Sequence, residues 1–352
     1  MSVWNTVKAK DTAVKPPPAP GEPLPRQSSN DNSSLLHVNS LQLPEGIASK
    51  YSIVRSLGSG AYGTALLMKE VATGDQYVAK IMNLTKMSEK ERAHMRSEVQ
   101  CLAQCDHPNI IRQKEVALSA TSLALVMEYG DGGDLRKEIL ARKSKGMVFS
   151  VEEIAIVFAQ IALSIDYVHR QGILHRDVKP ANIFFTKQGL VKLGDFGFSK
   201  QYEDTLSNLV GDTVCGTPFY MSPEMWQDER YSKKSDLWSL GIVLYEMICL
   251  ERPFQGDSLK AVSESVMAGV LRLPPTREGA NSPSGAQELW LGCQMLLKVN
   301  VRDRAELLEV LALPVFQNAL KNINSLLLHP TMESIRPKLT TSLSEFLIKS
   351  GT

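Results

Sequence analysis

Apolar residues recur with two different spacings along this chain of 352 residues. Short runs rich in β-branched and aromatic residues, separated by glycine or by Thr-Gly-Asp, predict antiparallel strands over 51–57, 64–70 and 76–82. A further apolar run at 122–129 has the same strand character. From residue 88 onward, the apolar spacing becomes that of a helix face. Strands followed by helices predict an α+β fold of two lobes.

Two capping boxes mark the starts of the first long helices. Ser88 with Glu91, and Ser150 with Glu153, each place a hydroxyl at the N-cap and a carboxylate three residues later. The apolar stripe over 154–168 is so wide that we expect this helix to lie in the core. Further helices are expected at 236–248, 286–299 and 304–313.

Both ends of the chain lack this periodicity. Residues 1–46 include six prolines within 16–25, which predicts a disordered segment with a polyproline stretch; a ligand for a proline-reading domain is the alternative. Residues 317–352 are expected to form a tail that packs on its own domain or frays, with a partner-docking helix as the alternative. A capping box at 342–345 would begin one short helix. Residues 51–316 then form the folded domain.

Charge and composition exclude several classes of protein. Lys plus Arg is 39 and Asp plus Glu is 38, a balance that predicts no nucleic-acid partner. The most apolar stretch, 241–250, is too short to span a membrane, so we expect no membrane association. Five thinly spread cysteines favour a reducing compartment, and we expect a cytoplasmic protein with cytoskeletal association and nuclear entry left open. The cluster Cys101, Cys105 and His107 is interpreted as a helix face rather than a metal site.

A glycine-rich turn separates the first two predicted strands. Gly58, Gly60 and Gly63 form G-x-G-x-x-G, which opens a dinucleotide-binding fold only when a helix follows. A strand follows here, so the glycines are expected to let backbone amides approach a phosphate tail. Lys80 lies in the third predicted strand. Taken alone, a lysine in an apolar strand is more often an edge or snorkelling residue than a ligand. Glu98, in the first capped helix, would pair with Lys80 and hold its ammonium against phosphate oxygens.

The densest run of chemically active residues is HRDVKPAN, which contains Asp177, Lys179 and Asn182 and is followed by DFG beginning at Asp195. Phosphoryl transfer requires mainly positioning and charge stabilisation. A carboxylate must orient the attacking hydroxyl, a role that Asp177 suits. Asn182 and Asp195 offer metal ligands, and Lys179 offers a cation for the transferring group.

These motifs resemble, in their order along residues 51–316, the catalytic domain of eukaryotic protein kinases. Residues 222–224 occupy the position of the APE motif. Arg304 is similar to the arginine that pairs with that glutamate, and Asp236 to the aspartate that braces the catalytic loop. The resemblance implies a bilobal kinase fold with ATP and Mg²⁺ in the cleft.

Finer features resemble one branch of the family. PANIF, CGTPFYMSPE and YSKKSDLWSLGIVLYEM are similar to the never-in-mitosis-A-related (NEK) serine/threonine kinases. The resemblance implies protein substrates with Ser or Thr acceptors, and Phe198 after DFG accompanies a preference for serine. Val78 and Ala65 depart from the usual alanine and valine, which changes the shape of the pocket only. The alternatives are a pseudokinase scaffold and a small-molecule kinase; the lysine and both aspartates are present, and GTPFYMSPE favours a protein substrate.

The resemblance also assigns individual residues. Backbone groups of Glu128 and Gly130 would bind the adenine edge, Met127 would guard the pocket behind it, Asp134 would contact the ribose and Phe184 would lie under the adenine. The expected nucleotide contacts are Leu57, Gly58, Ser59, Gly60, Ala61, Tyr62, Gly63, Thr64, Ala65, Val78, Lys80, Met127, Glu128, Gly130, Asp134 and Phe184. The expected catalytic residues are Asp177, Lys179, Lys80 and Glu98, and the expected metal ligands are Asn182 and Asp195.

The family resemblance extends to regulation. The arginine before the catalytic aspartate, here Arg176, usually binds a phosphate on the activation segment, residues 195–224. Thr217 is expected to contact Asp177 and Lys179, which leaves Thr213 as the preferred phosphosite. An upstream kinase or autophosphorylation would supply the phosphate.

Overall fold

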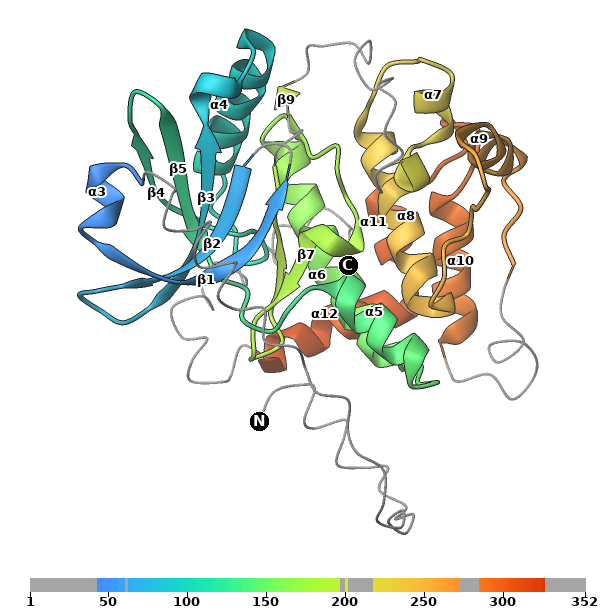
Figure 1. Ribbon diagram of the computed structural model, residues 1–352. Coiled ribbons are helices and arrows are strands. Elements are labelled where there is room, and N and C mark those ends of the chain that lie inside the picture. Colours follow the sequence, from blue (N-terminus) through green and yellow to red (C-terminus); the bar gives the residue numbers. More distant parts are fainter. Residues whose placement is uncertain (1–42, 61–62, 197–199, 202–217, 273–284, 327–352) are drawn as a thin grey trace, which may run out of the picture. The chain divides into compact units, whose positions relative to one another are not determined.

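The computed structural model describes residues 43–60, 63–196, 200–201, 218–272 and 285–326 (Figure 1). They fall into two compact units. Unit 1 consists of the chain up to Ala93 together with Arg112–Tyr129, and unit 2 consists of His94–Ile111 together with the chain from Gly130. Several predictions concern residues outside the described ones: the segment up to 42, Ala61, Tyr62, Phe198, Thr213, Thr217 and the capping box at 342–345.

Unit 1 is built on a five-stranded antiparallel sheet (Figure 1). Its strands are β1 (Tyr51–Gly60), β2 (Gly63–Glu70), β3 (Gln76–Asn83), β4 (Gln113–Leu118) and β5 (Ser122–Glu128), in the order β1-β2-β3-β5-β4. The four predicted strands are therefore confirmed. The edge strand β4 has no counterpart among the predictions, because it begins with three polar residues and exposes Val116 and Leu118.

A short helix before the sheet covers part of its apolar face. In α3 (Glu45–Ala48), Ile47 is fully buried and packs in one cluster with Leu66, Met68 and Val126. The chain is then tied to the sheet, since the N–H of Val71 donates to the carbonyl of Lys50 at 2.9 Å. Helix α3 thus lies across the predicted boundary between the N-terminal segment and the domain.

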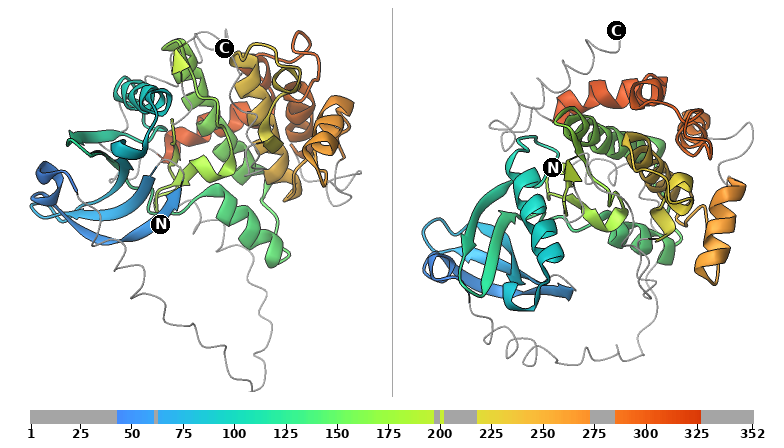
Figure 2. Two further views of the ribbon diagram at one scale, coloured as in Figure 1. Left: turned by 45° about the horizontal axis from the view of Figure 1, so that its top comes forward. Right: turned by 90° about the horizontal axis from the view of Figure 1, so that it is seen from above.

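Unit 2 contains most of the helices (Figures 1 and 2). Its helical elements are α5 (Leu135–Ser144), α6 (Val151–Arg170), α7 (Pro223–Trp226), α8 (Lys233–Cys249), α9 (Leu259–Ala268), α10 (Ala286–Leu296), α11 (Leu307–Leu311) and α12 (Pro314–Leu326), with short turns η2 (Pro180–Asn182) and η3 (Pro218–Tyr220). Two small sheets pair β6 (Ile173–Leu174) with β9 (Lys200–Gln201), and β7 (Ile183–Phe185) with β8 (Val191–Leu193). Helix α4 (Glu89–Ala103) follows the turn η1 (Leu84–Lys86), beginning in unit 1 and continuing in unit 2.

The core of unit 2 lies around α6 and α8. Helix α10 packs against α8, and α12 packs against α6 (Figure 2). Residues 235–248 of α8 are all buried, which explains why its sequence is apolar on every side. Helix α12 crosses the predicted end of the domain at 316, and its Leu320 and Ile323 are buried. Among the described residues, no helix is both long and apolar enough to cross a membrane.

Both predicted capping boxes are confirmed. The N–H of Glu91 donates to Oγ of Ser88, and the N–H of Ser88 donates to the Glu91 carboxylate at 2.7 Å. The box of Ser150 and Glu153 begins α6. The carboxylate of Glu153 also accepts both Nη groups of Arg142, at 2.8 and 2.9 Å, and so joins the end of α5 to the start of α6.

The Cys101, Cys105 and His107 cluster lies at the end of α4, with all three residues buried. The Cys105 thiol donates to the carbonyl of Cys101 at 3.2 Å. The Nδ1 atom of His107 accepts from the N–H of Asn109 at 3.1 Å, and burial lowers the pKa of this histidine to about 3. These contacts tie the helix end to the following turn.

The burial of Ile47 leads to a test of the role of α3. We expect Ile47→Ala to lower the free energy of unfolding by about 2 to 5 kcal/mol, because it removes apolar contacts and leaves a cavity. Urea unfolding followed by fluorescence measures this change. Val71→Ala is the matched control, because Val71 is 70% exposed and its truncation should cost less than about 0.5 kcal/mol. Equal effects of the two substitutions would contradict a structural role for α3.

Candidate active site

A buried carboxylate in the first turn of α8 organises the catalytic loop. The side chain of Asp236 is fully buried, and it accepts the backbone N–H groups of His175 at 3.0 Å and Arg176 at 2.9 Å. Nε2 of His169 lies 2.7 Å from Oδ2, and the Tyr231 hydroxyl donates to Oδ1. Burial by itself raises the pKa of Asp236, but these hydrogen bonds hold it below its usual value. The predicted brace is therefore present.

The backbone of the loop turns sharply at the residues that Asp236 binds. Arg176 has a φ of +66°, a left-handed conformation that an arginine adopts only when its surroundings impose it. Its guanidinium carbon is 5.5 Å from the centroid of the Tyr231 ring. His175 is fully buried beside Phe196, with ring centroids 4.8 Å apart, and burial lowers its pKa. The next residue, Asp177, follows this turn and is itself buried, only 5% exposed.

Three predicted functional residues meet at the end of this loop. Nζ of Lys179 lies 2.6 Å from Oδ2 of Asp177. Nδ2 of Asn182 donates to the same Oδ2 at 2.8 Å and to the Asp177 carbonyl at 2.9 Å. Because both partners bind Oδ2, they restrict the rotamer of the Asp177 carboxylate.

A hairpin brings the two predicted metal ligands together. Strands β7 and β8 pair Ile183 with Leu193, and the N–H of Gly194 donates to the Asn182 carbonyl at 2.9 Å. Asp195 follows directly, exposed and with a φ of +58°. Among the described residues no three His, Cys, Asp or Glu side chains gather as a metal cage. One carboxylate with one amide oxygen is, however, the sparse donor set that Mg²⁺ uses when phosphates complete its shell.

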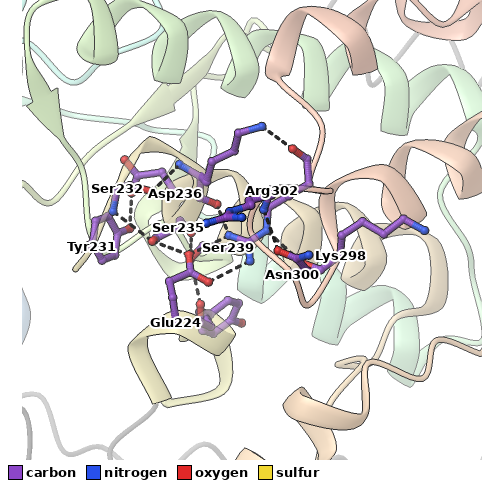
Figure 3. Close-up of polar contacts among 12 residues, drawn as sticks. Glu224, Tyr231, Ser232, Ser235, Asp236, Ser239, Lys298, Asn300 and Arg302 are labelled. Atoms are coloured by element: carbon purple, nitrogen blue, oxygen red, sulfur yellow. Dashed lines mark hydrogen bonds and ion pairs between the residues drawn. The ribbon is translucent and has the colours of Figure 1, made fainter. Parts of the chain in front are cut away.

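A second buried charge pair involves Glu224, a residue of α7 (Figure 3). Nη1 and Nη2 of Arg304 donate to the two carboxylate oxygens of Glu224, at 2.8 and 2.9 Å. Ser235 donates to Oε1 of Glu224 at 2.6 Å, and Lys234 supplies a carbonyl to Nη1 of Arg304 at 2.6 Å. These donors keep the pKa of Glu224 below its usual value although burial raises it. The pairing predicted for Glu224 and Arg304 is confirmed.

The predicted nucleotide residues of unit 1 lie on β1, β2, β3 and β5. Lys80 is half-buried on β3, opposite Ala65 of β2 and Leu125 of β5. Gly63 has a structural reason to lack a side chain, since a Cβ there would stand 2.2 Å from the Ile81 carbonyl oxygen. The strands also carry Leu57, Thr64, Val78, Met127 and Glu128. Residues 58–60, expected in a turn, instead continue β1, because they pair with residues 63–65 of β2.

The predicted nucleotide residues of unit 2 have local structural roles. Gly130 permits close approach of the chain to Phe184, whose Cβ would lie 2.7 Å from a Cβ at position 130. Asp134 is the N-cap of α5, accepting from the N–H of Lys137 at 2.9 Å and pairing with its Nζ at 2.8 Å. Glu98 is buried on α4. The proposed contacts of these residues with a nucleotide remain predictions.

Sequence reasoning missed several residues that position the loops. His169, Tyr231 and Ser235 act on Asp236 and Glu224 from neighbouring elements. Ser239 also donates to the Tyr220 carbonyl, at 2.9 Å. The only available signal was the spacing of two serines, one and three residues from Asp236, on an otherwise apolar helix.

A fixed Asp-Lys-Asn catalytic loop, beside an aspartate on a hairpin, defines a phosphotransferase of the protein kinase class. The family model described as "Protein kinase domain" matches residues 51–316. The chain belongs to the protein kinase family.

Several curated proteins are similar to this chain. "Putative serine/threonine-protein kinase A" of Trypanosoma brucei brucei is 40% identical over 301 residues, covering 85% of this chain and 68% of that protein. "Serine/threonine-protein kinase Nek1" of Mus musculus is 40% identical over 262 residues, covering 74% of this chain and 21% of that protein. "Serine/threonine-protein kinase Nek5" of Homo sapiens is 36% identical over 293 residues, covering 83% of this chain and 38% of that protein. The enzyme is a serine/threonine protein kinase, and the resemblance to the NEK branch is confirmed.

We expect Asp236→Asn to disrupt the catalytic loop. The amide N–H₂ of asparagine would face hydrogen-bond donors that need an acceptor, and breaking such a buried network lowers the free energy of unfolding by about 3 to 5 kcal/mol. We expect this loss of stability in urea unfolding, together with loss of kinase activity. Asp166→Asn is the matched control, because its pair with Arg170 at 2.8 Å is partly exposed, with side chains 26% and 21% accessible, and should contribute less than about 1 kcal/mol. A stable, active Asp236→Asn protein would refute the anchoring role.

Proposed function

We propose that this kinase transfers the γ-phosphoryl group of ATP to a serine or threonine hydroxyl, with Asp177 orienting that hydroxyl. The observation that carries the proposal is the fixed geometry of Asp177, whose Oδ2 is held by Lys179 at 2.6 Å and Asn182 at 2.8 Å. A carboxylate held in this way can accept the hydroxyl proton as the P–O bond forms. Lys179, next to the same oxygen, is positioned to offset charge on the transferring group.

The metal site of the proposal consists of Asn182 and Asp195. Two nearby oxygen donors, one of them an exposed carboxylate, fit Mg²⁺ that is bound partly by phosphates. When bound, Mg²⁺ neutralises phosphate charge and lowers the barrier to transfer. Because Nδ2 of Asn182 donates to Asp177, the Oδ1 atom of Asn182 is the atom that would serve as the metal ligand.

The nucleotide part of the proposal rests on the family resemblance. Lys80 would bind the phosphates of ATP, with Glu98 as its ion-pair partner, and the glycines of β1 and β2 would cover the phosphate tail. We propose serine as the preferred acceptor, because Phe198 follows the DFG motif and such a bulky residue accompanies a preference for serine in related kinases.

A phosphate-transfer assay tests the catalytic assignments. With radiolabelled ATP and a generic protein substrate, Asp177→Asn, Asp195→Ala and Lys80→Met should each lose about 100-fold or more of the wild-type rate. Asp257→Asn is the control, because Asp257 is exposed and lies outside the proposed site. Equal rates for the wild type and all three site variants would refute the assignments.

A second test concerns activation. We propose that phosphorylation of Thr213, by an upstream kinase or by the enzyme itself, adds about −1.5 to −2 charge that pairs with Arg176. Thr213→Ala should then lower activity, and phosphopeptide mapping should find Thr213 modified in active protein. Thr205→Ala is a control in the same segment. Full activity of Thr213→Ala, with no phosphate found at Thr213 in the wild type, would exclude this site.

A further inference from the structure

Arg252 lies against the segment that leads into α7. Its guanidinium carbon is 4.2 Å from the centroid of the Phe219 ring and 5.8 Å from that of Tyr220. The side chain remains 27% exposed. Stacking uses the flat face of a guanidinium and leaves the N–H donors in its plane for hydrogen bonding. Arg252 also hydrogen-bonds the Tyr220 side chain, so part of its donor set is fixed within the protein and the rest can bind a ligand.

The backbone that carries Arg252 is held on both sides. Helix α8 ends before Leu250, which has a φ of +58° and donates its N–H to the carbonyl of Glu246 at 2.9 Å. Beyond Arg252, the Phe254 side chain is only 1% exposed and stacks on Trp238, with ring centroids 5.3 Å apart. The guanidinium is thus presented from a fixed turn, which lowers the entropy lost when it binds a partner.

The positive charge of Arg252 is only partly balanced. Its Nε lies 3.6 Å from Oε1 of Glu246, which also accepts the Tyr220 hydroxyl at 2.6 Å. Burial raises the pKa of Glu246 above its usual value, and the same carboxylate also interacts with the charge of Arg136. The neighbouring Glu251 is exposed, so water screens its charge. Two arginines therefore share one buried carboxylate, which leaves excess positive charge near Phe219.

We propose that Arg252 is a specificity-determining residue that binds an acidic group, a carboxylate or a phosphate, of the protein substrate. The inference rests on the proposed function, because Phe219 and Tyr220 directly follow Gly216-Thr217-Pro218, the expected substrate-side loop. A planar guanidinium matches both anions with paired hydrogen bonds. The same cation repels lysine and arginine in a substrate, which narrows the choice of sequence.

Peptide kinetics test this proposal. A set of serine peptides carries glutamate, phosphoserine, glutamine or lysine at one flanking position at a time, and kcat/KM is measured for each. For wild-type enzyme we expect an acidic residue at one position to be favoured over glutamine by roughly 3- to 10-fold, and lysine to be disfavoured there. The preference should fall as salt is added, because an exposed ion pair is screened. Comparing glutamate with phosphoserine shows which anion the site takes.

Substitutions assign the preference to Arg252. Arg252→Met keeps an apolar stem on Phe219 and should bring the acidic-to-neutral ratio of kcat/KM close to one. Arg252→Lys keeps the charge without the planar fork and should give an intermediate ratio. Arg302→Met is the matched control, because it removes an exposed arginine from the loop before α11 and should leave the ratio unchanged. The ratio is insensitive to a general loss of activity, which affects both peptides equally.

Two results would overturn the proposal. The first is a wild-type ratio of one at every position, and the second is an unchanged ratio in Arg252→Met. If kcat/KM for acidic and neutral peptides falls equally in that variant, Arg252 supports Phe219 only. Transfer to none of the peptides by the wild type would instead refute the proposed function, and this inference with it.

Discussion

The structure of the active site depends on a negative charge that has no contact with water. Asp236 is fully buried, and a bare carboxylate there would be strongly destabilising. Two backbone N–H groups, a histidine and a tyrosine hydroxyl satisfy it, so the charge is stable only while the catalytic loop keeps its shape. The left-handed conformation of Arg176 is maintained in the same way. Separating these groups would be energetically costly, so the backbone that carries Asp177 is held in place.

The N-terminal half of α8 extends this constraint to the segment 218–224. Ser235 donates to Glu224 (Figure 3). Asp236 holds the catalytic loop, and Ser239 donates to the Tyr220 carbonyl. Because these residues belong to one helix, α8 fixes the positions of the catalytic loop and the segment 218–224 relative to each other. The far end of the same helix supplies Glu246, which orients Tyr220 and lies next to Arg252. One buried helix thus connects catalytic positioning with the surface proposed to select the substrate.

Local sequence signals predicted the regular elements wherever the signal was itself local. The capping boxes at Ser88 and Ser150 depend on residues three apart, and both occur in the structure. The edge strand β4 and the helix α3 depend on distant partners: β4 exists because β5 pairs with it, and Ile47 is buried because the sheet offers an apolar face. No pattern within either segment distinguishes it from a loop. The same limit applies to His169 and Tyr231, whose importance comes only from their contact with Asp236.

The sequence by itself determined the class of enzyme, because phosphoryl transfer requires particular residue types and HRDVKPAN with DFG supplies them at a recognisable spacing. It also identified Asp177, Lys179, Asn182 and Asp195 as candidates. Only the tertiary structure decided how three of them meet, since Lys179 and Asn182 converge on one carboxylate oxygen of Asp177. It likewise revealed Arg252 on Phe219, an arrangement between residues that are far apart in the chain. The residue types determine which chemistry is possible. The orientation of these residues and the balance of their charges depend on packing between segments that no local pattern connects.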